Sequence, residues 1–135
     1  LKTITNFNPI DLMNKLLLLP LSLLLLSCYD QERNCSDFKT GKFRFEHEVD
    51  GVKKVTEFVR NDSIEIETFE GRIDTATVRW VSDCEYILQK KHPRNRAEEK
   101  AIVMKILTTT KESYTFEFGM VGSDARQKGT VKKID

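Results

Sequence analysis

The residue types that most often carry out chemistry are scarce in this chain of 135 residues, which has three cysteines and two histidines. The cysteines are Cys28, Cys35 and Cys84, and the histidines are His47 and His92. A zinc site is usually built from closely spaced ligand pairs, and the sequence has no CxxC or HxxxH pair. It also lacks the GxSxG, Walker A, HExxH and Rossmann signatures. We therefore expect no metal and no cofactor.

Two further sets of titratable residues suit catalysis poorly. His47 follows Phe43 and Phe45 at alternate positions, and we interpret it as a residue at the rim of an apolar face. The acidic residues Glu65, Glu67 and Glu70, with Asp62, could supply the paired carboxylates that hydrolyse a glycoside. The alternation of Glu65 and Glu67 with isoleucines, however, predicts that both point outward, with no apolar pocket to raise a pKa. We predict no catalytic residue.

A basic segment, Lys90–Lys100 (KKHPRNRAEEK), interrupts the strand-like part of the chain. Its lysines and arginines surround His92, an arrangement suited to phosphate, lipopolysaccharide or a sugar acid. The alternative is a solvated loop, because Pro93 disfavours regular structure and two glutamates follow directly. We favour the solvated loop.

Aromatic residues recur on one face of several predicted strands. They are Phe43, Phe45, Trp80, Tyr86, Phe116 and Phe118. In a barrel that is open at one end, these side chains would line a pocket for a small apolar ligand. The alternative, which we favour, is that they only fill the interior of a small barrel, since eight strands leave little room.

The elements that position these residues follow from a period of two, in which apolar and polar residues alternate from Gly41 onward. Asp50-Gly51 is a strong hairpin signal. The predicted strands cover approximately residues 43–49, 52–60, 64–69 (ending at Glu70-Gly71), 75–80, 84–88, 102–106, 114–120 and 128–134. About eight short strands joined mostly by tight turns predict an all-β antiparallel meander. A lipocalin-like barrel hides its edges best, and a β-sandwich or a curled open sheet is the alternative.

A leucine-rich segment precedes this domain. Met13-Asn14-Lys15 is followed by eleven residues, Leu16–Leu26, of which nine are leucine. A short basic segment and an apolar run indicate a signal peptide; a membrane-spanning helix would need about twice this length. The run ends at Leu25-Leu26-Ser27-Cys28, which resembles the lipobox of bacterial lipoproteins.

The resemblance implies that Cys28 carries a diacylglycerol, that the chain is cut before Cys28, and that the new amine is acylated. Such multiple acylation anchors a protein stably to a membrane. Residues 1–12 would then be an upstream extension, residues 13–27 a signal peptide, residues 28–40 a lipidated tether and residues 41–135 one β domain. The location implied is the bacterial cell envelope, at the outer membrane.

Two patterns in the remaining chain, Cys35-x-x-Phe38-x-Thr40-Gly41-x-Phe43 and Trp80-x-x-x-Cys84-x-Tyr86, resemble those of small uncharacterised β-rich lipoproteins of Bacteroidota. That resemblance carries no known activity. With Cys28 lipidated, Cys35 and Cys84 remain, and an oxidising compartment favours a disulfide between them. The alternative is two unrelated thiols.

The charge balance limits the classes of partner. The chain has a formal charge of +1, and residues 1–27, with Lys2, Lys15 and Asp11, also sum to +1. The part from Cys28 onward is therefore neutral, and we expect no nucleic acid partner. We predict a membrane-anchored, non-enzymatic lipoprotein that binds a small apolar ligand or serves as a structural part of an envelope assembly. The alternative is an envelope enzyme or enzyme inhibitor whose site the sequence does not reveal.

Overall fold

The computed structural model describes residue 10 and residues 33–135. The predicted signal peptide and the lipidated Cys28 lie outside the described residues, as does the predicted extension apart from Ile10. Within the part of the chain that is described, no helix is long and apolar enough to cross a membrane.

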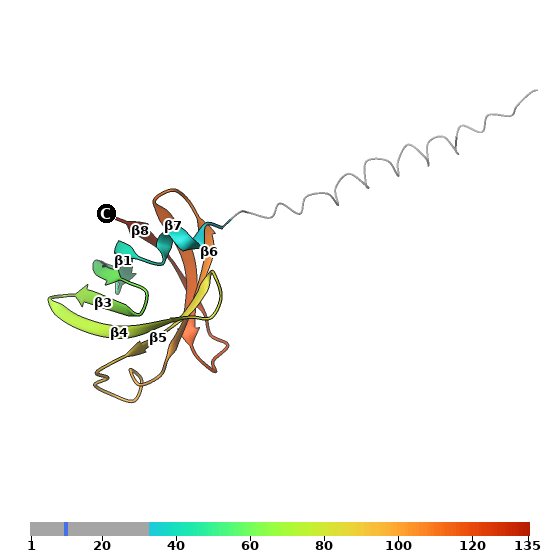
Figure 1. Cartoon of the computed structure of the whole chain (residues 1–135). Helices are drawn as coiled ribbons and strands as arrows, with labels where there is room; N and C mark the ends of the chain where they lie inside the picture. Colours follow the sequence, from blue (N-terminus) through green and yellow to red (C-terminus); the bar gives the residue numbers. More distant parts are fainter. Residues whose placement is uncertain (1–9, 11–32) are drawn as a thin grey trace, which may run out of the picture. The chain divides into compact units, whose positions relative to one another are not determined.

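Eight antiparallel strands form a closed barrel in which each strand pairs with its neighbours in sequence and β1 pairs with β8 (Figure 1). The strands are β1 (Gly41–Val49), β2 (Val52–Arg60), β3 (Ile64–Phe69), β4 (Arg72–Trp80), β5 (Glu85–Lys90), β6 (Ile102–Thr109), β7 (Ser113–Met120) and β8 (Gln127–Lys133). The predicted eight-stranded, lipocalin-like meander is confirmed. The sandwich and the open sheet, which were the alternatives, do not form.

Local turn chemistry sets the registers of the first hairpins. The β1–β2 turn places Asp50 and Gly51 at φ values of 52° and 76°, and the β3–β4 turn places Glu70 and Gly71 at 47° and 77°. Two successive residues with positive φ match the right-handed twist of the flanking strands. Between β2 and β3, the Asn61 side chain instead accepts hydrogen bonds from two backbone N–H groups that follow it.

Barrel closure depends on a short contact between the first and last strands. Only three residue pairs join β1 to β8, from Phe43↔Lys133 to Phe45↔Val131. Gly129 lies in β8 beside this seam, where an added Cβ would come within 2.7 Å of the Phe45 ring and 2.9 Å of the Phe116 ring. A glycine at this position therefore lets the two aromatic rings pack inside the barrel.

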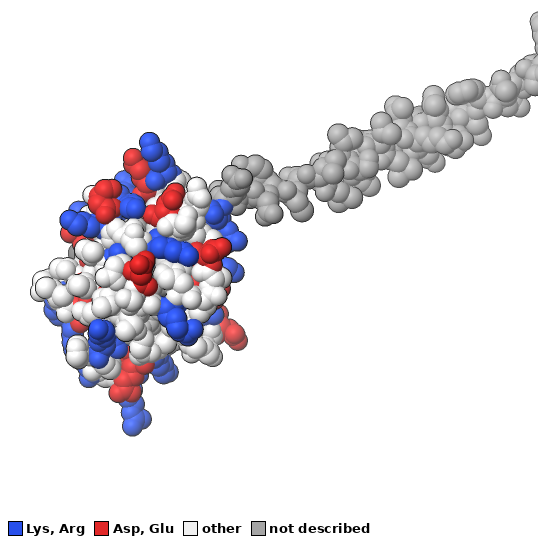
Figure 2. Space-filling model, viewed as in Figure 1, with Lys and Arg blue, Asp and Glu red and all other residues white. Residues whose placement is uncertain are grey.

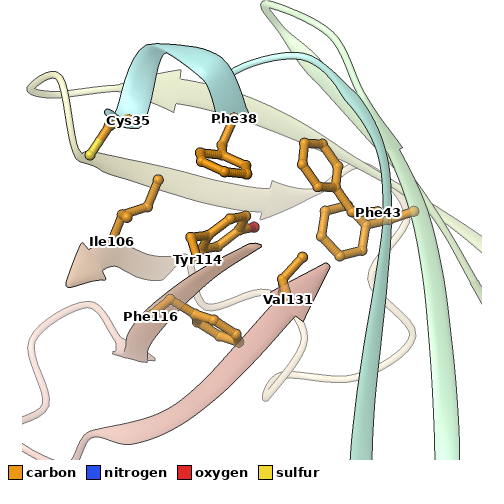
Figure 3. Close-up of a cluster of buried hydrophobic side chains, with 8 residues drawn as sticks. Cys35, Phe38, Phe43, Ile106, Tyr114, Phe116 and Val131 are labelled. Carbon is orange, nitrogen blue, oxygen red and sulfur yellow. The ribbon is translucent and has the colours of Figure 1, made fainter. Parts of the chain in front are cut away.

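One end of the barrel, the closed end, is covered by the 3₁₀ helix η2 (Cys35–Phe38). The Phe38 ring contacts Tyr114 at a centroid distance of 5.2 Å, and a disulfide joins Cys35 to Cys84 just before β5, with Cα atoms 5.3 Å apart. The core gathers beneath this helix (Figure 3). The main buried side chains shown there are Cys35, Phe38, Phe43, Ile106, Tyr114, Phe116 and Val131.

The covering helix corrects the predicted tether. Residues 28–40 were expected to link anchor and domain, but Cys35 and Phe38 are 2% and 1% exposed and belong to the core. The segment looked polar because only these two side chains point into the barrel. The domain therefore begins before Gly41, and the predicted disulfide ties this beginning to the barrel wall.

Candidate functional site

Beyond the core, the barrel interior holds a cavity in two adjoining parts. The deep part has a volume of about 190 Å³ and a mainly apolar lining that includes Phe45, Phe58, Met104, Phe116 and Phe118. The outer part has a volume of about 340 Å³ and is bounded by β3, β4, β5 and the loop between β5 and β6. Glu65, Glu67, Leu88 and Ile102 line both parts. The outer part alone has the volume of a small-molecule site, and the mainly apolar lining is also typical of one.

A buried arginine forms the floor of the deep part. Arg60 is 2% exposed, and its Nε donates to Glu65 Oε2 at 2.7 Å. One terminal nitrogen donates to the Phe38 carbonyl at 3.0 Å, and the other donates to the hydroxyls of Tyr86 at 2.6 Å and Tyr114 at 3.1 Å. The guanidinium also lies 4.4 Å from the centroid of the Tyr86 ring. Arg60 thus joins η2 to four strands of the barrel.

Charge and burial act together in this network. Burial by itself would lower the pKa of Arg60, but Tyr86, Tyr114 and Glu65 outweigh it and raise that pKa. Burial raises the pKa of Tyr86 and of Tyr114, so both phenols stay protonated and can donate hydrogen bonds. A buried ion pair needs this surrounding set of hydrogen bonds to offset its desolvation.

The acidic residues of β3 correct a second prediction. Glu65 and Glu67 were expected on the outer face, but both line the cavity, whereas Ile66 is 45% exposed. Glu65 is the direct cross-strand partner of Arg60, so the buried guanidinium and its counter-charge lie on the same inner face. Period two fixes which residues share a face, and it leaves open which face is inside.

Glu67 lies one step farther toward the cavity mouth on the same strand. Burial raises the pKa of Glu67, and the nearby Glu65 and Asp74 carboxylates raise it further, against the opposing effect of Lys90. The structure gives the Glu67 side chain no hydrogen bond or ion pair within residues 33–135. It is therefore a half-buried acid that faces the cavity without a partner in this part of the chain.

The mouth of the cavity carries a network of ion pairs. Asp74 accepts from Lys90 Nζ at 3.2 Å and from Arg94 at 2.5 Å, and Lys90 also contacts Glu98 at 3.2 Å. Although burial acts to raise the pKa of Asp74, Lys90 and Arg94 lower it below the ordinary value. The backbone N–H of Arg94 and the Lys90 ammonium likewise lower the pKa of Glu98. These contacts hold the β5–β6 loop against β4.

The aromatic residues predicted to line a pocket fall into two groups. Phe45, Phe116 and Phe118 line the deep cavity. Phe43 and Tyr86 are fully buried near the closed end, and Trp80 packs against Tyr86 at a centroid distance of 4.5 Å. The first group faces the space that a ligand would occupy, and the second group belongs to the packed core beneath it.

Of the other sequence candidates, His47 and His92 lie outside the cavity lining, whereas Lys90 and Lys100 of the basic segment line its outer part. His47 stacks between Phe45 and Phe69, at centroid distances of 4.9 Å and 5.8 Å. In the basic segment, Lys90 and Arg94 are engaged by acids, whereas His92 is exposed. Lysines and arginines mingle with acidic residues over the face shown in Figure 2. Cys28 lies outside the described residues.

The residues that sequence reasoning missed are those of the polar floor, above all Arg60 and Tyr114. A signal for Arg60 does exist, because Arg60 and Glu65 flank the Asn61 turn and oppose each other across it. Opposite charges at directly paired positions stabilise a hairpin on either face. The pattern therefore predicts the pair, and only the barrel shows that the pair is inside.

Within residues 33–135 and at residue 10, no group of three or more histidine, cysteine or acidic side chains is arranged to hold a metal ion. No protein-family model, curated protein or solved structure matches the chain. The function is therefore inferred from the cavity and its lining.

Proposed function

We propose that this protein is a lipoprotein of the bacterial envelope that binds a small apolar ligand inside its barrel without transforming it. The observation that carries the proposal is the deep cavity, whose apolar wall is formed by Phe45, Phe58, Phe116 and Phe118. Ligand sites of this kind are mainly apolar with a few polar groups that orient the ligand. Here the polar groups are at the floor and on β3.

Binding is favoured over catalysis by how the polar side chains are used. The Arg60 guanidinium makes four hydrogen bonds to protein groups, which holds it as part of the barrel floor. His47 stacks on two phenylalanine rings, and within residues 33–135 its Nδ1 has no hydrogen-bond partner, whereas a catalytic histidine meets an acid and a hydroxyl. Arg60 and His47 therefore both serve the structure of the barrel, which supports a binding role.

Binding can be tested with the neutral apolar dye phenylnaphthylamine, whose fluorescence rises in an apolar site. Ile102 lines both parts of the cavity, so Ile102→Trp should fill it and weaken dye binding about tenfold or more. Ile73→Trp makes the same change at an exposed outer position and should leave binding unchanged. A wild-type protein that binds no dye, or equal binding by Ile102→Trp, would contradict the proposal.

The anchored location is a separate part of the proposal, and it is supported by the lipobox-like end of the leucine-rich run. Lipidation at Cys28 should place the protein in the membrane fraction, because two or more acyl chains hold a protein stably. Cys28→Ala should move it to the soluble fraction while Cys35 and Cys84 still pair. Membrane partitioning that survives Cys28→Ala would rule the anchor out.

A second candidate role is docking to another envelope protein, and the outer face of β2–β4 favours it. Val59 and Ile66 are direct cross-strand partners, and with Ile73 they are 45–69% exposed. Ile66→Lys should reduce the size of complexes extracted from membranes if this face is an interface, and it should leave dye binding unchanged. A complex of unaltered size would remove this role.

A further inference from the structure

Glu67 differs in its ion pairing from the other acids that line the cavity. The other acids that line the cavity each pair with a base: Glu65 with Arg60, Asp74 with Lys90 and Arg94, and Glu98 with Lys90. Glu67 lines both the deep and the outer part, and no base within residues 33–135 pairs with its carboxylate. Among the described residues that line the cavity, Glu67 is therefore the one carboxylate without a paired base, and the cation Lys100 lies in the lining of the outer part alone.

The surroundings of Glu67 make that acceptor selective. Burial and the Glu65 and Asp74 carboxylates raise the pKa of Glu67 by more than Lys90 and Arg72 lower it, so an isolated negative charge is disfavoured at this site. A ligand that brings a positive charge would relieve this cost, because a carboxylate and an ammonium form a strong charge-assisted hydrogen bond. A ligand carboxylate would add a like charge beside Glu67, so repulsion would oppose its binding.

The deep part of the cavity defines the rest of the ligand. Phe45, Phe116, Phe118 and Met104 line it, and their side chains offer only apolar contacts and aromatic faces. Burying an alkyl group against them stabilises a complex by about 0.8 kcal/mol for each CH₂. Aromatic faces also attract a nearby cation. Arg60 is unavailable as a free anion-binding group because Glu65 and two tyrosines already engage it.

We propose that the ligand is an amphiphilic amine, whose protonated amino group donates a hydrogen bond to the Glu67 carboxylate while its apolar tail occupies the deep cavity. This inference rests on the proposed ligand-binding function and specifies the ligand's chemical class. It makes Glu67 the specificity-determining residue. Arg60 and Glu65 form the neutral polar floor at which the tail ends.

The test compares three probes with the same tail: octylamine, octanol and octanoate. Each is titrated at neutral pH against wild-type protein loaded with phenylnaphthylamine, and displacement of the dye is measured. Octylamine should bind about tenfold or more tightly than octanol, and octanoate should bind more weakly than octanol. In Glu67→Gln, octylamine should lose its advantage while octanol keeps its affinity.

Glu48→Gln is the matched control, because it removes the same charge from an exposed position of β1. It should preserve the preference for octylamine. Equal affinities of octylamine and octanol in the wild type, tighter binding of octanoate, or an amine preference that survives Glu67→Gln would each overturn the inference. Any of these three outcomes would leave the proposed ligand-binding function intact. That function would be contradicted if none of the three probes displaced the dye. Circular dichroism verifies that both variants fold.

Discussion

Arg60 is the residue on which the closed end depends. It is 2% exposed, bonds Glu65, Tyr86, Tyr114 and the Phe38 carbonyl, and stacks on aromatic rings. A buried pair adds little net stability over apolar residues of similar shape, but removal of one partner strands the other charge. Arg60→Met should therefore lower the free energy of unfolding by about 3–5 kcal/mol, measured by urea denaturation.

The double variant separates the stranded charge from the lost packing. Arg60→Met combined with Glu65→Leu leaves no unpaired carboxylate, so it should be more stable than Arg60→Met alone. The hydroxyls of Tyr86 and Tyr114 accept hydrogen bonds from Arg60, and the loss of this donor is a cost that both variants share. A double variant as unstable as the sum of the two single variants would mean that the ion pair contributes no coupling.

Glu67 should make stability depend on pH in the direction opposite to Asp74. The folded-state pKa of Glu67 is raised by burial, so its favourable contribution is complete below its ordinary pKa and is lost as the pH rises through the raised value. Glu67→Gln should therefore be more stable than wild type at neutral pH, with a gain that disappears in acid. Thermal melts across this range test it, and a constant difference would contradict it.

Asp74 provides the contrast for the same melts. Despite the effect of burial, Lys90 and Arg94 lower its folded-state pKa, so its contribution is present above the ordinary pKa and is lost as the pH falls through the lowered value. Asp74→Asn should be less stable than wild type at neutral pH, and this difference should shrink in acid. As the pH falls, the stability of both variants should therefore approach that of the wild type, Glu67→Gln from above and Asp74→Asn from below.

Among the strands, β7 contributes three inward aromatic side chains, more than any other strand. Tyr114 and Phe116 are 1% and 3% exposed, Phe118 is partly buried, and only Met120 at the strand end is 42% exposed. Truncation of a buried phenylalanine loses transfer free energy and leaves a cavity. Phe116→Ala should therefore cost about 3–5 kcal/mol in urea denaturation. Glu117→Ala, at the next position on the outer face, is the control, and a loss below about 1 kcal/mol for Phe116→Ala would assign this stripe to a binding surface instead.

The elements also show how far sequence patterns reach. The alternation in β7 and the Asp50-Gly51 signal predict strands and hairpins that the structure contains. Large aromatic side chains mark the inner face unambiguously in β7, because such a stripe cannot stay in water. In β3, Ile66 and Glu67 offer no such marker, because the inner face there is set by Arg60 on the neighbouring strand. The polar part of the site was therefore hidden from a strand-by-strand analysis.

At the scale of the whole molecule, closure is the feature that sequence could suggest but not locate. Burial of sheet edges favours a barrel, yet the seam consists of three residue pairs between strands that are far apart in sequence. The covering of the closed end by Cys35–Phe38 was likewise missed, because two inward residues in a polar segment form no periodic pattern. Both features depend on contacts between residues that are far apart in sequence.

The disulfide is the covalent counterpart of that long-range pairing. It joins residues 49 apart in sequence and fixes η2, whose Phe38 carbonyl accepts a hydrogen bond from Arg60. In the chain-entropy account, closing a loop of this length stabilises a fold by about 4 kcal/mol.

Reduction of the wild type, or Cys35→Ala with Cys84→Ala, should therefore lower the free energy of unfolding by about 4 kcal/mol. Because η2 covers the polar floor, the reduced protein should also expose Tyr114 to solvent, which near-ultraviolet circular dichroism detects. A loss below about 1 kcal/mol with an unchanged spectrum would mean that packing of Phe38 alone holds the closed end.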